Sequence, residues 1–400
     1  MRAQVVIGSG FGDEGKGLMT DYLCHKAGPW ATVVRFSGGA QAGHTVQLPN
    51  GQRHVFHHFG SGTLAKAFTC LGPEFLVNPL LFWQERDELS DGFGPLPALE
   101  VIRCHPQAWV TTPYDMLLNQ LVESARGGER HGSCGVGIGE TVARSQAGFG
   151  ISVSDIEFPD RLERRLRQIE QAWVPRRASK LGISGWQSAV DGIFANRYKF
   201  LDACHSMRRR MLLTDEAPET KIIFEGAQGL LLDQRHRFFP HVTRSNTGLT
   251  NVLPMAERWG LEGLDVTYVT RAYLTRHGAG PMPNEVNGRP YYLIEDKTNV
   301  PHPFQGDLRF GFLDLDLMRE AIRKDLEHTG LWFERISANV ALTCIDHVQD
   351  SGGMFVWHRE GAQAAGTLGD LCDAVREATG LPVQYISRGP TRSTIEEQFP

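Results

Sequence analysis

Near its start the chain carries Val5-Val6-Ile7-Gly8-Ser9-Gly10-Phe11-Gly12-Asp13-Glu14-Gly15-Lys16-Gly17, an apolar run followed by a glycine-rich loop. A helix-like segment, Leu18 to Lys26, comes next, and a second apolar run extends from Ala31 to Phe36. The order strand, glycine loop, helix, strand indicates a βαβ unit, and such units build parallel sheets. The sequence therefore predicts an α/β fold of the P-loop type, with a mainly parallel central sheet.

The first glycine loop fits a phosphate-binding pattern, because Gly10 to Lys16 matches GxxxxGK. Glycines let backbone N–H groups approach phosphate oxygens, and the N-terminus of the following helix favours an anion. The next residue is Gly17, where the usual loop has a serine or threonine that binds Mg²⁺. The metal ligand must then come from elsewhere, and Asp13 is a candidate. A plain turn with surface acids is disfavoured, since so many glycines cost backbone entropy.

A second glycine-rich loop, Ser37 to Thr45, follows the second predicted strand. Loops at the carboxyl ends of neighbouring parallel strands border one crevice, so Asp13 and His44 are expected to face the same ligand. A carboxylate and an imidazole across one substrate can act as base and acid. With 15 histidines in the chain, His44 alone carries little weight.

Composition excludes several classes of protein. The 400 residues are 41% hydrophobic and 22% charged, with a net charge of −5, so no basic surface for nucleic acid is expected. No apolar run is long enough for a membrane span, and no signal peptide is expected. The seven scattered cysteines form no CxxC motif, which argues against a disulfide framework or structural zinc. A soluble protein of the cytoplasm fits best.

The remaining pattern extends the α/β prediction along the chain. It predicts a flexible loop over 127–150 and an exposed helix over 160–177. Further strands are expected at 221–224, 265–270 and 339–345, and further helices at 315–328 and 367–379, the last with Thr367 and Asp370 as a capping pair. No segment resembles a linker, so residues 1–400 are expected to form a single large domain with helical insertions.

Together the two glycine loops resemble those of the adenylosuccinate synthetase family, WGDEGKGK and QGGxNAGHT. Further stretches stand in the family's order. They are Phe224–Asp233 (family FEGAQGxLLD), Pro240–Thr247 (YPYVTSSNT), Thr275–Glu285 (TRVGAGPFPTE), Gly311–Asp314 (GWLD), Leu342–Asp346 (LTKLD) and Ser387–Pro390 (STGP). The resemblance covers most of the chain and implies an adenylosuccinate-synthetase-like fold.

The resemblance also implies an activity, a GTP-dependent ligation of a 6-oxopurine nucleotide to L-aspartate through a 6-phosphoryl intermediate, with Mg²⁺. In the family the loop aspartate takes the N1 proton and binds Mg²⁺, and here it corresponds to Asp13. By the same match Lys16 holds the transferred phosphoryl group, and His44 donates to the phosphoryl bridge. Gln228 bonds the purine 6-oxygen, and the Gly43 carbonyl binds Mg²⁺.

The same match implies three groups of binding residues. The GTP phosphates would contact Gly12, Gly15, Lys16, Gly17, Gly43, His44 and Thr45. The guanine would contact Asp346, Ser387 and Gly389. The purine nucleotide would contact Asp13, Gln41, Ser133, Cys134, Arg144, Gln228, Thr243 and His277. Of these, Ser133, Thr243 and Arg144 would hold the 5′-phosphate, and in the family that arginine comes from the partner subunit of a homodimer.

The chain departs from the family where it recognises sugar, base and amino acid. The arginine-rich loop TTGRRRRTG, which binds the aspartate carboxylates and the ribose, is replaced by Pro303–Gly311 with one arginine, Arg309. A single guanidinium can still bind a carboxylate bidentately, so Arg309 is predicted to hold the amino donor. His277 replaces a valine near the ribose, and Cys344 replaces a lysine that packs on guanine, so ATP is a possible co-substrate. Gln41, Cys134 and Val136 also differ.

Several alternatives stay open. A phage branch of the family makes a succinylated 2-aminopurine deoxynucleotide from dGMP, but it commonly lacks the loop aspartate, so the retained Asp13 favours IMP or dIMP. A P-loop GTPase or kinase is a different enzyme class, against which Gly17 argues. A nucleotide-binding regulator without ligase activity is a third possibility, which the altered arginine loop allows.

Overall fold

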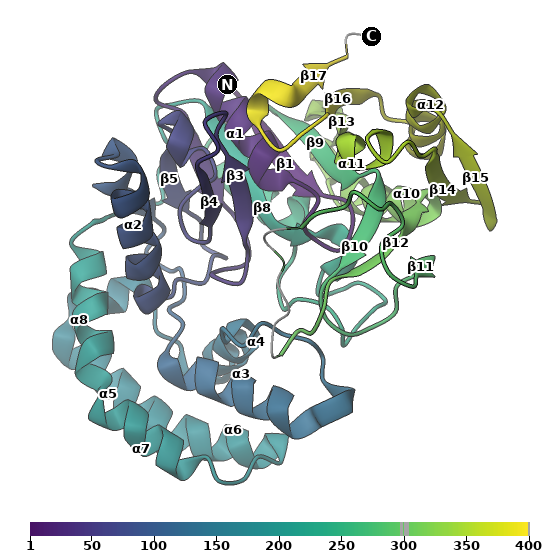
Figure 1. The fold of residues 1–400 in the computed structure, drawn as a ribbon. Helices are drawn as coiled ribbons and strands as arrows, with labels where there is room; N and C mark the ends of the chain where they lie inside the picture. Colours follow the sequence, from purple (N-terminus) through teal and green to yellow (C-terminus); the bar gives the residue numbers. More distant parts are fainter. Residues whose placement is uncertain (297–298, 300–303, 399–400) are drawn as a thin grey trace.

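The computed structural model describes residues 1–296, 299 and 304–398. Its centre is β1 (Arg2–Gly8), which lies between β8 (Ile222–Gly229) and β9 (Gly263–Arg271) and pairs with both in parallel. Val5, Val6 and Ile7 are completely buried, as expected for a strand covered on both faces. The opening apolar run is therefore the middle strand of a sheet, and it delivers the first glycine loop to the sheet's carboxyl edge (Figure 1).

Ten strands form this main sheet, in the order β17-β16-β13-β9-β1-β8-β2-β5-β6-β7. Neighbouring strands are parallel except for the antiparallel pair at one edge, β16 and β17. The remaining members are β2 (Thr32–Arg35), β5 (Phe68–Leu71), β6 (Ile102–Cys104), β7 (Met211–Leu213), β13 (Ile336–Thr343), β16 (Val383–Ser387) and β17 (Ile395–Glu397). The predicted α/β class and mainly parallel sheet are confirmed.

Two smaller sheets flank the main one. One contains β10 (Tyr273–Arg276), β11 (Glu285–Val286), β12 (Arg309–Asp314), β14 (Phe355–Arg359) and β15 (Ala362–Gly366). The other is the antiparallel pair β3 (His44–Gln47) and β4 (Arg53–Phe56). Because β3 starts at His44, the second glycine loop ends where this hairpin begins.

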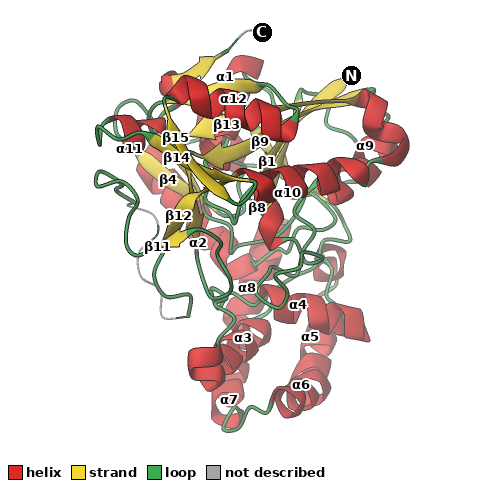
Figure 2. Cartoon of the chain, turned by 90° about the vertical axis from the view of Figure 1, so that its right-hand side faces the viewer, coloured by secondary structure: helices red, strands yellow, loops and turns green. Residues whose placement is uncertain are grey.

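The helices fall into two groups. Five accompany the main sheet and the sheet beside it: α1 (Lys16–Ala27), α9 (Val252–Arg258), α10 (Leu315–Glu327), α11 (Ile345–Gln349) and α12 (Leu368–Thr379). The others come from the long insertion between β5 and β7, and most of them lie beneath the sheets (Figures 1 and 2). They are α2 (Pro79–Phe93), α3 (Pro113–Arg126), α4 (Ile138–Arg144), α5 (Pro159–Gln168), α6 (Val174–Leu181), α7 (Gln187–Ala195) and α8 (Arg197–Arg208).

Most predicted elements lie where the sequence placed them. The capping pair of α12 is present, since the Thr367 hydroxyl accepts from the Asp370 N–H and the Asp370 carboxylate accepts from the Thr367 N–H. The segment 127–150 differs, because it contains α4 and a π-helical turn over 145–149. The segment 160–177 is helical as predicted, although Leu162, Leu166 and Ile169 bury one face of it. The single domain stays a prediction.

No described helix is both long and apolar enough to cross a membrane.

A buried ion pair joins α3 to α4. The Arg144 guanidinium donates through Nε and Nη2 to the Asp115 carboxylate, at 2.8 and 2.9 Å. It also donates to the carbonyls of Val110 and Phe149, at 2.7 and 2.6 Å. Both charged side chains are fully buried. This is the point at which the segment predicted to be flexible is fixed to the helical layer.

We expect Arg144→Met to lower the free energy of unfolding by about 3–5 kcal/mol, because it leaves the Asp115 carboxylate buried without its cation. Arg167→Met is the matched control. Arg167 also pairs with a carboxylate, Glu163 at 2.9 Å, but the pair is largely exposed, so its loss should cost about 0.5 kcal/mol or less. Denaturant unfolding of both variants checks this, and equal losses would contradict it.

Candidate active site

The first glycine loop is organised around its own carboxylate. Glu14 Oε1 accepts from the N–H groups of Gly10 and Gly12, at 3.0 and 2.7 Å, and Oε2 accepts from Lys16 Nζ at 2.5 Å. Burial opposes ionisation, but the Lys16 charge and the N–H donors outweigh it and hold the pKa of Glu14 below its usual value. The N-terminus of α1 is the part of this loop that is open to an anion, since Gly15, Lys16 and Gly17 line the cavity there.

Close packing explains Gly17, the residue that breaks the usual P-loop pattern. A Cβ at this position would lie 2.9 Å from the Thr45 carbonyl oxygen and 3.0 Å from His44 Cβ. A serine or threonine does not fit there without displacing the second glycine loop. The metal-binding hydroxyl is thus absent because the two glycine loops lie directly against each other.

His44 is held by a carboxylate from the middle of the main sheet. Its Nδ1 lies 2.8 Å from Glu225 Oε1, and its Nε2 lies 3.3 Å from the Ala227 carbonyl oxygen. Glu225 also accepts from the Ser61 N–H and hydroxyl, and Arg35 Nε lies 3.7 Å from Glu225 Oε2. Both contacts of the imidazole are acceptors, so the geometry favours a proton on each nitrogen, whereas burial of the ring opposes its positive charge. A ring in that state can donate a proton or a hydrogen bond from Nε2.

Charge and burial act in opposite directions on this pair. Burial lowers the pKa of His44, while the Glu225 carboxylate raises it, and burial prevails. For Glu225 burial raises the pKa, but His44 and Arg35 reverse this and hold it at about 2. The carboxylate therefore stays ionised and favours a proton on Nδ1 of His44.

Asp13 has the properties of a proton acceptor. It lines the cavity in a left-handed conformation with φ 61°, and Arg271 Nε donates to its carbonyl oxygen. Burial raises the pKa of the Asp13 carboxyl, although the charges of Arg271, His277 and Lys16 oppose the rise. A raised pKa brings a carboxylate nearer to the strength needed of a general base at neutral pH.

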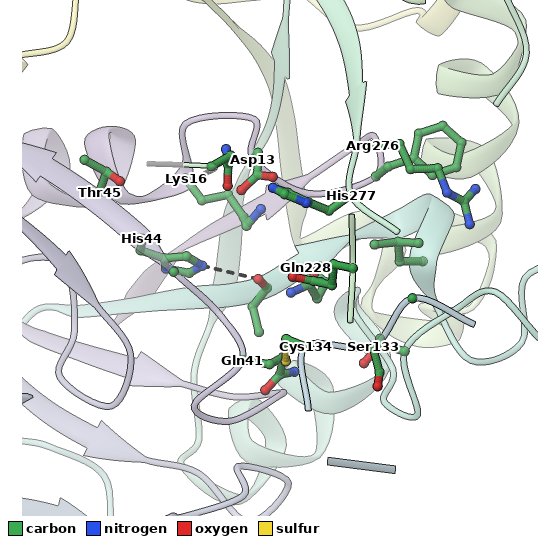
Figure 3. Close-up of a pocket in the computed structure, with 18 of the residues that line it drawn as sticks. Asp13, Lys16, Gln41, His44, Thr45, Ser133, Cys134, Gln228, Arg276 and His277 are labelled. Atoms are coloured by element: carbon green, nitrogen blue, oxygen red, sulfur yellow. Dashed lines mark hydrogen bonds between the residues drawn. The ribbon is translucent and has the colours of Figure 1, made fainter. Parts of the chain in front are cut away.

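Side chains from both glycine loops and from β8 meet at one cavity of about 1210 Å³. In Figure 3, Asp13, Lys16 and His277 lie on one side of Gln228, and Gln41, Cys134 and Ser133 lie on the other. Both amide atoms of Gln41 and Nδ1 of His277 are buried without a hydrogen-bond partner among the described residues. Such unmatched polar atoms indicate groups that a ligand completes. Thr45, Gly43 and Thr243 line the same cavity.

The end of the cavity near the carboxyl ends of β13 and β16 is lined by a carboxylate, a hydroxyl and a thiol. Asp346, Ser387 and Gly389, which the resemblance assigns to guanine, line it, and the Ser387 hydroxyl donates to the Gly389 carbonyl at 2.8 Å. Cys344 lines it too. Burial raises the pKa of its thiol, but Arg271 and His347 outweigh burial, and the pKa of Cys344 lies below its ordinary value.

Comparison with known proteins agrees with this geometry. The sequence profile of adenylosuccinate synthetases matches residues 5–335. The adenylosuccinate synthetases of Xanthomonas oryzae and Xylella fastidiosa are 33% and 32% identical, over 80% of this chain and 73% of theirs. The chain belongs to the adenylosuccinate synthetase family. Members of this family are carbon–nitrogen ligases of purine biosynthesis, and this chain is one of them.

Two solved structures share the fold. The fully ligated adenylosuccinate synthetase of Plasmodium falciparum superposes with a TM-score of 0.71 at 17% identity, covering all of both chains. The succinoaminodeoxyadenylate synthetase of cyanophage S-2L, bound to dGMP and to dATP as energy donor, superposes with a TM-score of 0.55 at 16% identity. That comparison covers 99% of this chain and 95% of the phage chain.

Two arginines expected at the synthetase site do not line the cavity. Arg309 lies in β12, where its guanidinium binds both carboxylate oxygens of Glu285 and the carbonyls of Gly278 and Gly280. The guanidinium expected to hold the amino donor is therefore bound within its own chain in this structure. Arg144 is likewise buried against its own chain, where it binds Asp115. Pro303, the first residue of the rebuilt loop, lies outside the described residues.

The sequence did not reveal three residues that shape the synthetase site. Glu14 and Glu225 belong to quoted motifs, but nothing in either motif shows that these carboxylates hold Lys16 and His44. Arg271 joins Asp13 to Asp296, whose carboxylate lies 3.4 Å from Nη2. All three side chains are buried or nearly so, and a buried charge in a glycine-rich loop is a signal that it has a defined partner.

We expect Glu225→Gln to lower the pKa of His44, because it removes the negative charge that opposes burial. Histidine ring NMR over a pH titration measures the pKa of His44. The signal that is missing from the His44→Asn spectrum is assigned to His44. Glu85→Gln is the matched control, since Glu85 is equally buried and lies 3.3 Å from His58, so it should affect His58 and leave His44 unchanged. An unchanged His44 titration in Glu225→Gln would contradict the assigned role.

Proposed function

We propose that this ligase condenses IMP or 2′-deoxy-IMP with L-aspartate, at the expense of GTP, to give adenylosuccinate or its deoxy form, GDP and phosphate. The observation that carries the proposal is a single cavity lined by Asp13, a partly buried carboxylate with a raised pKa, and by Lys16 and His44 of the two glycine loops. A base and a phosphate site in one cavity suit the activation of a purine oxygen.

The chemistry follows from the substrate. The purine 6-oxygen is amide-like and a poor leaving group. Asp13 takes the N1 proton, the 6-oxygen attacks the γ-phosphorus of GTP, and the bond to the β-phosphate oxygen breaks to release GDP. The amino group of aspartate then attacks C6, loses a proton, and displaces phosphate. Phosphoryl transfer needs mainly positioning and neutralisation of charge, for which Lys16 and His44 are placed.

The donor set also fits Mg²⁺. Asp13 offers one carboxylate and Gly43 one carbonyl at the cavity, and no cluster of three or more metal-binding side chains occurs among the described residues. Mg²⁺ is commonly held by one or two carboxylates together with substrate phosphates, where it neutralises charge on those phosphates. Asp13 and Gly43 would hold it.

A second candidate substrate is dGMP, with ATP or GTP as energy donor. The fold shared with the cyanophage synthetase, whose structure holds dGMP and dATP, favours it. Cys344 in place of the family's lysine favours a relaxed choice between GTP and ATP. We prefer the hypoxanthine nucleotides because Asp13 is retained, and a 2-amino group beside it would lack a matched contact.

We expect phosphate release only when a 6-oxopurine monophosphate, L-aspartate and GTP are present together. IMP, dIMP, GMP and dGMP are compared at saturating aspartate, and IMP or dIMP should give the fastest turnover. Asp13→Asn is the inactive reference, with kcat lower by ~10²-fold because the general base is lost. Activity should also fall as the pH drops through the raised pKa of Asp13, since the protonated carboxyl cannot accept the N1 proton.

Other outcomes identify the alternatives. Phosphate release from GTP alone would indicate a GTPase, and no release under any condition would indicate a regulator. If dGMP were the only one of the four monophosphates to be converted in the presence of aspartate, this would indicate the phage-type reaction. Wild-type turnover in Asp13→Asn would exclude Asp13 as the base.

We further expect Asp346→Asn to raise KM for GTP by ~10-fold or more, because a carboxylate accepts from guanine N1 and N2 and an amide accepts less well. KM for ATP should change little, since adenine offers neither donor. Asp373→Asn in α12 is the control, because Asp373 is exposed and does not line the cavity. Wild-type use of ATP as readily as GTP would contradict guanine recognition by Asp346.

A further inference from the structure

Seven lysine and arginine side chains of the described residues line the cavity, and six of them are already engaged. Lys16, Arg126, Arg177 and Arg271 pair with carboxylates, Arg276 donates to three carbonyls, and Arg53 also has a partner. Arg244 differs from all of these. Its side chain is exposed and has no hydrogen bond, ion pair or ring contact with any described residue.

The backbone on either side of Arg244 is fixed although its side chain is not. The Thr243 N–H donates to the Leu232 carbonyl at 2.9 Å, and the Ser245 carbonyl accepts from the Gln234 N–H at 3.1 Å. Its stem runs beside α4, since a Cβ on Gly139 would lie 3.5 Å from Arg244 Cγ. A cation on a fixed backbone, at the wall of a cavity and without a partner, suits an anionic ligand.

Arg244 directly follows Thr243, one of the residues that the family resemblance assigns to the 5′-phosphate. The arginine assigned to the same phosphate, Arg144, has Nε and both Nη atoms bound to Asp115 and to two carbonyls inside its own subunit. Without it, the assigned phosphate contacts are the hydroxyls of Thr243 and Ser133 alone. Neutral hydroxyls do not balance a phosphate dianion, so a cation is missing from this set.

We propose that Arg244 binds the 5′-phosphate of the 6-oxopurine nucleotide from within the same chain, in place of an arginine from a partner subunit. The inference rests on the proposed function, and names the group that makes this site prefer a nucleotide to a nucleoside. The planar guanidinium can donate two parallel hydrogen bonds to phosphate oxygens. The purine site is then complete in one subunit.

The test compares IMP with inosine, which lacks the phosphate. Arg244→Ala should raise KM for IMP about 10- to 100-fold, in the range of a lost charged hydrogen bond, with kcat nearly unchanged. Inhibition by inosine should change less than about twofold, because inosine makes no such contact. The KM for IMP of Arg244→Lys should lie between those of the wild type and of Arg244→Ala. An ammonium keeps the positive charge but cannot donate two parallel hydrogen bonds as a guanidinium does.

Arg235→Ala is the matched control. Arg235 is exposed on the same loop and, like Arg244, its side chain has no partner among the described residues, but it does not line the cavity. It should leave KM for IMP unchanged. An equal rise in both variants would show a general effect of surface charge and would overturn the proposal.

Mixing two variants that are each impaired at low IMP concentration separates binding within the chain from binding across subunits. Arg244→Ala and Lys16→Ala are combined at an IMP concentration below KM. If Arg244 acts within its own chain, no mixed assembly contains a complete site and activity stays low. Recovered activity would show that Arg244 acts on the partner's site and would overturn the proposal.

The outcomes also separate this inference from the proposed function. An unchanged KM for IMP in Arg244→Ala, with active wild-type enzyme, would refute the role of Arg244 and leave the ligase function intact. Wild-type protein that neither binds nor converts any 6-oxopurine monophosphate would refute both.

Discussion

The arrangement of the cavity depends on one buried carboxylate, that of Glu225 in the middle of the main sheet. It contacts His44 at the start of β3, Ser61 in the segment after β4, and lies beside Arg35 in β2. Removing a carboxylate from water costs on the order of several kcal/mol unless partners replace the water, so these contacts must form together. The second glycine loop is thereby held at the sheet. Because Gly17 fits against His44 and Thr45, the start of α1 is held with it.

The strands and glycine loops were predictable because their signals are local. An apolar run bounded by glycines, such as residues 5–7, has few alternatives to a buried parallel strand. The partners of charged side chains were not predictable in this way. Asp115 is 29 residues from Arg144, and Glu285 is 24 residues from Arg309, so their pairing depends on tertiary structure. A family motif places a residue in the sequence, and the surrounding carboxylates determine what that residue can bind.

The segment 127–150 shows the same limit for secondary structure. Its glycines and small polar residues predict a loop, since glycine is a poor helix former. The structure instead has α4 over Ile138–Arg144, with Ile138 and Val142 buried and Arg144 bound to α3. Local preference for a loop is overcome by the buried ion pair and by apolar contacts, neither of which a local pattern contains. Within the segment, residues 130–137 form the longest stretch without regular structure.

Some residues of the site lie in strands and others lie in connections between elements. This difference explains which residues could change. His44 begins β3 and Gln228 lies in β8 of the main sheet, so a substitution at either position disturbs the packing as well as the chemistry. Arg244, His277 and Cys344 lie in connections between elements and face the cavity. Their side chains can change without altering strand register. Loops at the edge of a rigid sheet can therefore acquire a new contact for phosphate, sugar or base while the proton acceptor and phosphate cradle stay in place.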